Sequence, residues 1–520
     1  MSSSWTKRWS EFKSPLRVVV GFLQQSRQRK ERWCQELKRR LEEAVQITAQ
    51  QEAELGRQRE IIQELKQQRR CWESGQGEPR GPLIRLPEDP PIGSHGYGAR
   101  MVELAVTLAQ TVGLRGAERA MQILFAWLGL DRAVPQATTI RTWLQRLGVA
   151  ELGEALEAAD DWIWIVDHSN QIGVEKVLVV LAVRAAQLPA PGQTLKHEDV
   201  RVLLMRPGTH WKREDMAAIY QELAERQGAP RAVLSDGAVE LREGVAGLKD
   251  RRSDTIVLSD FKHKAANFLK ALLGRDKRFG AFTAQVGRTR SAIQQTELAH
   301  LTPPAQKPKA RFMNLEATLN WAAVSLWVLN HPHTQADAWG VTADRLEEKL
   351  GWLWSFAEDL TVWQECQQVV NQGLTFINEQ GVFGGAAAQL DQQWSGLHHQ
   401  ASRRLADQLR GVVADAEKLL KKGERLPMST EILESTFGLY KQLERQHAQG
   451  GFTSLLASLP ALLQKPTAEK VKQAFAKVSV KHVKKWVSAN LGQTLTSKRL
   501  TTYGQFKHAL KSATKRAVLT

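Results

Sequence analysis

The chain has 520 residues, of which 42% are hydrophobic and 24% charged, and its 72 Lys and Arg outnumber its 55 Asp and Glu to give a net charge of +17. At roughly 150 residues per domain this length predicts about three or four domains, and the composition excludes a disordered chain. The basic excess indicates a polyanionic partner, nucleic acid first and an anionic membrane surface second.

Residues 1–73 are predicted to form an N-terminal helical, coiled-coil region. The first residues lack the apolar stretch and cleavage site of a signal peptide. From about Ser26 to Arg70 a heptad seam follows alternating steps of three and four. The seam comprises Cys34, Leu37, Leu41, Ala44, Thr48, Gln51, Leu55, Gln58, Ile62 and Leu65. We interpret it as a self-association helix; a single solvated helix is the alternative.

A helix-turn-helix DNA-binding domain is predicted at residues 99–158, after a linker at 74–98 that is dense in Gly and Pro. The last of its three helices is expected to start at Thr138 or Thr139 as the N-cap. Its apolar face comprises Ile140, Trp143, Leu144 and Leu147. As a recognition helix it would present outward side chains to phosphates or base edges, namely Arg141, Gln145 and Arg146. A plain structural three-helix bundle is the alternative.

Residues 159–264 change to a pattern of strands with two helices. Strands are predicted at 162–167, 176–183 and 199–208, within 230–237 with its end on Asp236, and within 255–264 with its end near Asp260, and helices at 212–228 and 239–250. The order is β-β-β-α-β-α-β. Three strands in a meander and two added through helical crossovers imply a mixed sheet with helices on its faces.

The remainder of the chain reads as almost entirely helical. Residues 265–425 carry tryptophans on apolar faces, which are most simply the core of a helical domain. Residues 461–520 form a basic tail, with 13 Lys and Arg between Lys465 and Arg516 against a single acid, Glu469. This tail is either a solvated basic face or a surface for a polyanion.

Two classes of protein are disfavoured by the chain as a whole. No stretch approaches about 20 uninterrupted apolar residues, so a membrane-spanning helix is not expected. The three cysteines, Cys34, Cys71 and Cys366, lie far apart without a C-x-x-C pair, which disfavours a disulfide framework and a cysteine zinc site. We therefore expect a cytoplasmic protein in a reducing compartment.

Carboxylates end two of the predicted strands. Asp167 ends the first strand and Asp236 ends the fourth. An isolated aspartate at such a position is ordinarily a turn residue. However, the predicted element order is that of the ribonuclease H-like fold, in which acids at these two positions lie side by side and a third comes from a late helix.

The sequence resembles the DDE transposases of bacterial insertion sequences, in the transposase and retroviral integrase superfamily. The resemblance rests on IVDHSNQ around Asp167, VLSDGAVELREGV around Asp236, VLSDFKHKAANFLK around Asp260 and STEILESTFGLYKQL around Glu434. It spans roughly residues 90 to 460. It implies an RNase H-like α/β core with a five-stranded mixed sheet, interrupted by a large all-α insertion at 265–425 and completed by a glutamate helix at 426–460.

Glu434 is the third catalytic acid that this resemblance implies. Lys441, seven residues or about two turns later, lies on the same helix face and would contact the DNA end. The competing acids are Glu431, Glu316 and Glu297.

Three further polar residues near the predicted strand ends are expected to be structural. Asp260 ends the fifth strand. The fourth strand lies between this strand and the strand of Asp167, which argues against Asp260 as the second catalytic acid. His263 is expected to be a buried structural residue, with an outer-shell or DNA contact as the alternative. His168 alternates to the opposite face from Asp167 and is not expected to be a ligand.

The implied chemistry is cleavage at transposon ends and transfer of the resulting 3′-hydroxyl into target DNA. Two Mg²⁺ ions, with Mn²⁺ as a substitute, would be held by Asp167, Asp236 and Glu434, because hard cations prefer oxygen ligands. The implied partners are double-stranded DNA and further copies of this chain in a homodimer or higher oligomer, in a nucleoid-associated location. The alternatives are an RNase H-like nuclease or resolvase without strand transfer, and a catalytically silent domesticated DNA-binding protein.

Overall fold

The computed structural model describes residues 88–93, 96–172, 175–306, 312, 315–332, 340–445, 453–491 and 495–517, with scattered positions between 27 and 66. The chain divides into two compact units, Met1–Glu88 and Asp89–Thr520. In the first unit the seam positions Thr48, Leu55, Gln58 and Ile62 are helical and exposed. The other six seam positions lie outside the described residues, so the coiled coil stays a prediction.

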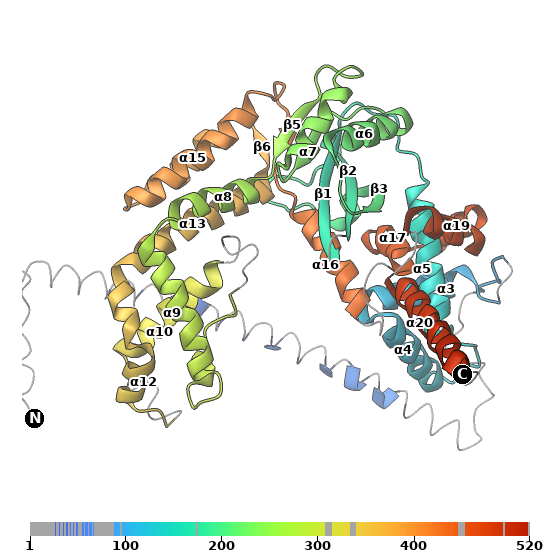
Figure 1. Cartoon of the computed structure of the whole chain (residues 1–520), viewed down its shortest axis with the longest axis horizontal. Helices are drawn as coiled ribbons and strands as arrows, with labels where there is room; N and C mark the ends of the chain where they lie inside the picture. The colour runs from blue at the N-terminus through green and yellow to red at the C-terminus, as the bar shows by residue number, and fades with distance from the viewer. Residues whose placement is uncertain are drawn as a thin grey trace, which may run out of the picture. The chain divides into compact units, whose positions relative to one another are not determined.

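A five-stranded mixed sheet forms the centre of the second unit (Figure 1). Its strands are β1 (Trp162–Ile172), β2 (Glu175–Arg184), β3 (Arg201–Gly208), β4 (Ala232–Ser235) and β5 (Ile256–Ser259). They lie in the order β3-β2-β1-β4-β5, with β1–β2 and β2–β3 antiparallel and β1–β4 and β4–β5 parallel. The predicted element order is confirmed, and the sheet is compatible with an RNase H-like core.

Strand β1 buries side chains on both faces, because helices cover both. Trp162, Trp164 and Val166 pack against the crossover helices α6 (Arg213–Gln227) and α7 (Val239–Glu243). A 3₁₀ turn, η3 (Gly244–Leu248), follows α7 directly. Ile163 and Ile165 belong to the larger core on the other face. Alternation therefore places Asp167 on the second face and His168 on the first.

The fifth strand ends at Ser259, next to Asp260 as predicted. However, FKHK forms the first turn of helix α8 (Phe261–Leu273), which begins before the helical region predicted from residue 265. Asp260 starts this helix, because its side chain accepts a hydrogen bond from the His263 amide and so caps it.

The predicted helix-turn-helix segment forms three helices, α3 (Ala99–Val112), α4 (Leu114–Trp127) and α5 (Ala137–Leu152). The predicted threonine cap of α5 is wrong, since the N-cap position is Gln136 and no side chain of that position caps the helix. Instead, the carboxylate of Glu118 on α4 accepts a hydrogen bond from the Ala137 amide at 2.9 Å. The cap therefore comes from the neighbouring helix.

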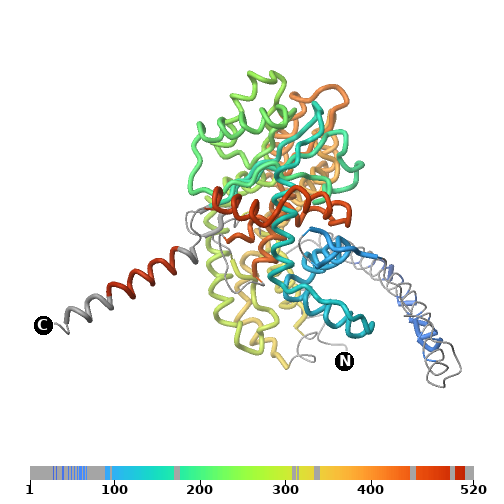
Figure 2. Tube along the Cα trace, turned by 90° about the vertical axis from the view of Figure 1, so that its right-hand side faces the viewer, coloured from blue at the N-terminus to red at the C-terminus, as the bar shows by residue number. Residues whose placement is uncertain are grey.

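Helix α5 is a central helix and not a free recognition helix. The C-terminal segments that cover it are η7 (Ser454–Ser458), α17 (Leu459–Leu463), α18 (Ala468–Lys477) and α19 (Val480–Leu491). Figure 2 shows these segments in red against α5, ahead of α20 (Leu495–Ala517). The contact is so close that a Cβ on Gly148 would lie 2.0 Å from the carbonyl oxygen of Ala457.

The insertion is helical, as predicted, except for one short ribbon. Its further helices are α9 (Lys277–Ile293), η4 (Ala299–Leu301), α10 (Leu315–Asn330), α12 (Ala343–Leu350), η6 (Gly351–Phe356), α13 (Ala357–Gln380), α14 (Ala386–Gln393) and α15 (Gln400–Glu417). Trp363 packs among Phe279, Phe282 and Phe356 in its core. The ribbon pairs β6 (Val382–Phe383) with β7 (Arg425–Leu426) and so closes the insertion just before α16 (Glu431–Arg445).

Within the described residues, no helix combines the length and the apolar character that a membrane crossing needs. Cys366 is buried and unbridged in the insertion core, whereas Cys34 and Cys71 lie outside the described residues.

Candidate active site

The parallel pairing of β1 with β4 brings Asp167 and Asp236 to neighbouring positions. Val166 lies opposite Ser235 in the register, and the two aspartates come next on their respective chains. Paired strands lie about 4.8 Å apart, so the two backbones are adjacent at this edge of the sheet. Asp236 then turns the chain, with Oδ1 accepting a hydrogen bond from the Ala238 amide at 2.9 Å and Gly237 in the left-handed region at φ 89°.

The two carboxylates repel each other in a largely buried setting. Burial and the charge of Asp236 raise the pKa of Asp167 to about 6, although a hydrogen bond from the His168 amide and the charges of His168 and His263 oppose the rise. The Asp167 side chain is 15% exposed, and its Oδ1 accepts the His168 amide at 2.6 Å. The site therefore favours a cation between these acids.

His168 lies on the other face of β1, as expected. Its Nε2 is 3.2 Å from the Glu240 carboxylate, and its ring stacks on Trp211 at 6.0 Å. These contacts fix the backbone beside Asp167, and they leave the imidazole Nδ1 3.9 Å from Asp167 Oδ1.

Asp260 connects β5, α8 and the start of α16. Its carboxylate is buried and accepts from the His263 amide at 3.0 Å, from the Thr430 amide at 3.0 Å and from the His263 ring at 2.6 Å. The Phe261 amide also donates to the Met428 carbonyl. Since both carboxylate oxygens are used, Asp260 holds the helix that carries Glu434 against the strand that follows Asp236.

His263 lies within electrostatic reach of the acid pair. Burial alone would lower its pKa, but the hydrogen bond and charge of Asp260, together with the charges of Asp236 and Asp167, raise it. The ring therefore holds a proton more readily than a free imidazole does, with its Nδ1 held by Asp260.

Glu434 is paired with a lysine that the sequence reading did not single out. Its Oε2 lies 2.7 Å from the Lys262 ammonium, and the same ammonium lies 3.1 Å from Glu431. Burial would lower the pKa of Lys262, but these two glutamates raise it. The only signal in the sequence was its place directly after Phe261, in the turn that follows the fifth strand.

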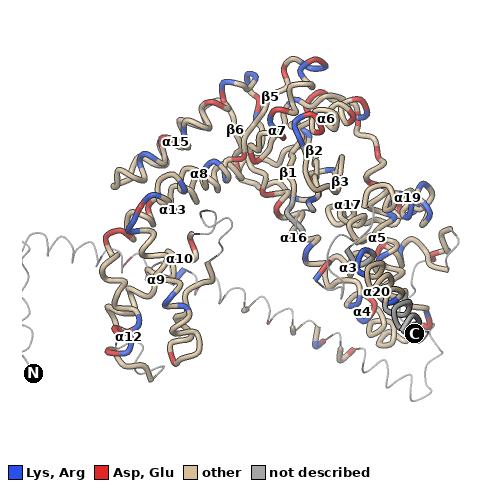
Figure 3. Tube along the Cα trace, in the orientation of Figure 1, with Lys and Arg blue, Asp and Glu red and all other residues tan. Residues whose placement is uncertain are grey.

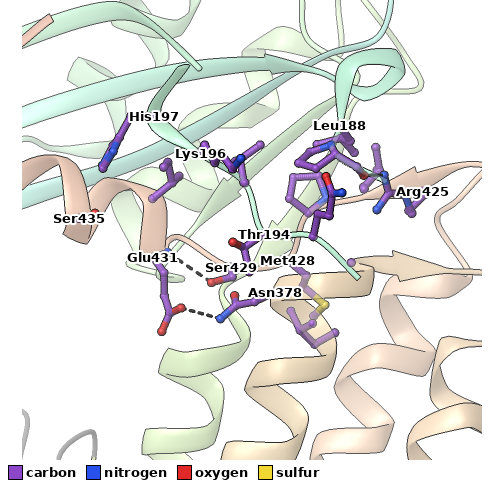
Figure 4. A pocket seen from close by; sticks show the side chains of 18 residues that line it. Leu188, Thr194, Lys196, His197, Asn378, Arg425, Met428, Ser429, Glu431 and Ser435 are labelled. Carbon is purple, nitrogen blue, oxygen red and sulfur yellow. Dashed lines mark hydrogen bonds between the residues drawn. The ribbon is translucent and has the colours of Figure 1, made fainter. Parts of the chain in front are cut away.

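The start of α16 borders a cavity of about 380 Å³. Figure 4 shows Glu431 on its wall, accepting a hydrogen bond from Asn378 at 2.5 Å while its amide donates to the Ser429 hydroxyl at 3.3 Å. Glu431 thus binds both Asn378 of the insertion and Lys262, whereas Glu434 pairs with Lys262.

The two remaining competitors lie in the insertion. Glu297 pairs with Arg345 at 2.7 Å, and Glu316 accepts a hydrogen bond from Asn371 at 2.9 Å. Of the predicted acids, the structure brings Asp167 and Asp236 together, and in its described part no group of three or more His, Cys, Asp or Glu side chains is arranged to hold a metal. Glu434 as third ligand therefore stays a prediction.

Lys441 lies on the same exposed face of α16 as Glu434, as the spacing predicts. The opposite face buries Leu433, Phe437 and Tyr440 in the core. A phosphate contact by Lys441 is compatible with this position.

Two of the three α5 residues predicted to contact DNA do not face solvent. Gln145 and Arg146 are buried, and they donate hydrogen bonds to backbone carbonyls of Ser454 and Val478 at 2.7 Å each. The structure argues against both as DNA contacts, because their polar groups are used inside the protein. Arg141 is partly exposed and stays a prediction.

Two of the comparisons with known proteins give no relative. No protein-family model matches this chain, and no curated protein matches it. Among solved structures, the Drosophila P element transposase strand transfer complex matches 73% of this chain and 94% of its own, at 9% identity and a TM-score of 0.39. A likeness this low has no bearing on activity, and the function rests on the site itself.

Proposed function

We propose that this chain is a DDE transposase, which cleaves DNA at transposon ends and joins the resulting 3′-hydroxyl to target DNA. The observation that carries the proposal is the pair of Asp167, within β1, and Asp236, directly after the parallel strand β4, where burial and mutual repulsion favour a bound cation. The basic excess of the chain supports DNA as the substrate.

The donor set fits hard divalent cations. Two carboxylates, with Glu434 from α16 as the third, would hold Mg²⁺ or Mn²⁺ through oxygen. Such ions, when bound, polarise the scissile phosphate and activate the attacking oxygen. Asp260 would position α16, and Lys441 would bind the phosphate backbone on the face that carries Glu434.

The three proposed ligands differ in how firmly the fold positions them. Strand pairing sets the positions of Asp167 and Asp236. Glu434 would have to leave the Lys262 ammonium in order to bind a cation, and rotation of its exposed side chain would allow this.

The test uses the purified full-length protein, Mg²⁺ and a DNA fragment that carries the sequences flanking the coding region. Cleavage at the ends with joined products is the expected result. Asp167→Asn and Asp236→Asn should abolish both steps and retain DNA binding, whereas Asp250→Asn, a matched change at an exposed site in the same domain, should leave both unchanged. Cleavage by either active-site variant would refute the assignment.

A catalytically silent DNA-binding protein is the second candidate. The ion pair of Glu434 with Lys262 favours it, because the third acid is neutralised by the protein itself. DNA binding without cleavage or joining would decide for this candidate, and cleavage of branched or hybrid duplexes without joining would decide for a nuclease.

A further inference from the structure

Helices α18 and α19 carry a group of exposed lysines that we name the basic ridge. It comprises Lys472, Lys477, Lys481, Lys484 and Lys485. Figure 3 shows basic residues gathered at α19. The described stretch 453–491 contains a single acid, Glu469, at the start of α18. This stretch therefore carries a strong excess of positive charge.

The lysines of the ridge have no acidic partners within the described part of the chain. Other lysines do, such as Lys418 with Asp415 and Lys421 with Asp254. On α19, Lys481 lies three and four residues before Lys484 and Lys485, so their charges are neighbours and repel. The first turn of α19 also has no acid, although a helix N-terminus favours negative charge. An external polyanion would relieve both penalties.

A buried arginine holds the ridge in place. Arg146 on α5 donates to the Val478 carbonyl at 2.7 Å and to the Phe475 carbonyl at 3.0 Å, and its guanidinium lies 3.6 Å over the Phe475 ring. These carbonyls belong to the end of α18, just before α19 begins. The arginine therefore satisfies the last turn of one basic helix and sets the direction of the next.

The apolar side of the two helices faces the protein. Val471 and Val483 are buried against the helical bundle that contains α5, whereas Val480 at the start of α19 is 43% exposed. A helix that binds a membrane surface needs a continuous free apolar face, and one exposed valine does not provide it. The geometry thus favours a partner that binds cations only, such as the phosphates of a duplex.

We propose that the basic ridge binds the backbone of double-stranded DNA without reading its sequence. Helix α19 has 12 residues and is about 18 Å long, which corresponds to about five base pairs of duplex along its axis and is enough for contacts with several phosphates. Lysines suit this role because each provides a compact charge for a phosphate without fixing a base. The proposal rests on the proposed function, since it names the surface that holds the substrate of that site.

The test is the triple variant Lys481→Gln, Lys484→Gln and Lys485→Gln in the full-length chain. Fluorescence anisotropy with a duplex of arbitrary sequence gives the affinity over a range of salt concentrations. The slope of log affinity against log salt should become shallower by about 2.7, which is 0.9 for each lost phosphate contact. The unfolding temperature should stay the same or rise, because repulsion between the lysines is removed.

The matched control removes the same charge at the end of α15, by Lys418→Gln, Lys421→Gln and Lys422→Gln. Its salt slope should stay that of the wild type. The inference would be overturned if the salt slope became shallower by the same amount in both triple variants, or did not change in the ridge variant. End cleavage by the wild type would still support the transposase in either case. Preferential binding of the wild type to vesicles of anionic lipid, lost in the ridge variant, would overturn it in favour of a membrane. No DNA binding by the wild type would refute both proposals.

Discussion

Replacing Asp167 with Asn should stabilise the metal-free protein at neutral pH while removing its activity. Asn has nearly the same shape and keeps an oxygen that accepts the His168 amide, so the main change is the loss of one buried charge. The wild-type carboxylate has a pKa raised from 3.8 to about 6 by burial and by Asp236. Because one pKa unit corresponds to about 1.4 kcal/mol, the ionised form costs the fold on the order of 3 kcal/mol.

The sign of the pH dependence follows from this raised pKa. Between about pH 4 and pH 6 the folded protein binds the Asp167 proton more tightly than the unfolded chain does, so the free energy of unfolding falls as the pH rises. The full cost is present above about pH 6. The Asn variant lacks this titration, and its advantage over the wild type should grow from near zero at about pH 4 to its maximum at about pH 8.

The assay is chemical denaturation in the presence of a chelator, followed by tryptophan fluorescence across that pH range. Asp161→Asn is the matched control at the beginning of the same strand. Burial alone would raise the pKa of Asp161, but hydrogen bonds from the Ala186 amide and from Arg184 lower it. The Asp161→Asn variant should therefore be less stable than the wild type at neutral pH, whereas Asp167→Asn should be more stable.

Millimolar Mg²⁺ provides a second arm of the same experiment. A cation that binds the folded site should stabilise the wild type, and the gain should fade below about pH 6 as Asp167 takes up a proton. The Asn variant should gain little. An Asn variant that is no more stable than the wild type at pH 8, or whose advantage is constant with pH, would contradict the repulsion between the two aspartates.

Three further predictions concern the supports of the site and its DNA contacts. Asp260→Asn should lower the free energy of unfolding by about 3 kcal/mol, because an amide N–H would face the His263 donors in a buried place; a denaturant titration measures it, and a loss under 1 kcal/mol would contradict it. Gly148→Ala should cost about 1–3 kcal/mol through overlap with a carbonyl of η7, whereas Gly280→Ala, with open space around it, should be neutral or stabilising; thermal unfolding distinguishes the two. Lys441→Ala should make the salt slope of DNA binding shallower by about 0.9, and an unchanged slope would exclude a phosphate contact.

The sheet could be predicted from the sequence because its signals are local. The continuous apolar run of WIWIVD and the turns between the apolar runs predict the strands in order, and the parallel register then places Asp167 beside Asp236. The start of helix α8 at Phe261 was missed, because the strand pattern runs directly into the residue that caps the helix. Asp260 follows the strand and is at the same time the N-cap, so no loop separates the two elements.

The role of α5 could not be predicted, because it depends on residues remote in sequence. Ile140, Trp143 and Leu144 are buried as their spacing predicts. Arg146 is buried as well, since its donors bind carbonyls 329 and 332 residues away. A helical pattern marks one apolar face, but it does not reveal that a second segment will cover the polar face and satisfy its hydrogen bonds.

The candidate active site likewise has one part that local patterns predict and one part that depends on contacts remote in sequence. Asp167 and Asp236 are fixed by backbone pairing within one sheet, so their proximity depends little on side-chain detail. Glu434 depends on contacts across the insertion, namely the Asp260 bond to the Thr430 amide and the Lys262 ion pair. Lys262 lies between Asp260 and His263 in the sequence, so the turn that positions α16 also supplies the ammonium that binds its glutamate. In the metal-free protein Glu434 is thus paired with Lys262, and in the proposed site a cation bound by the aspartate pair would compete with Lys262 for that glutamate.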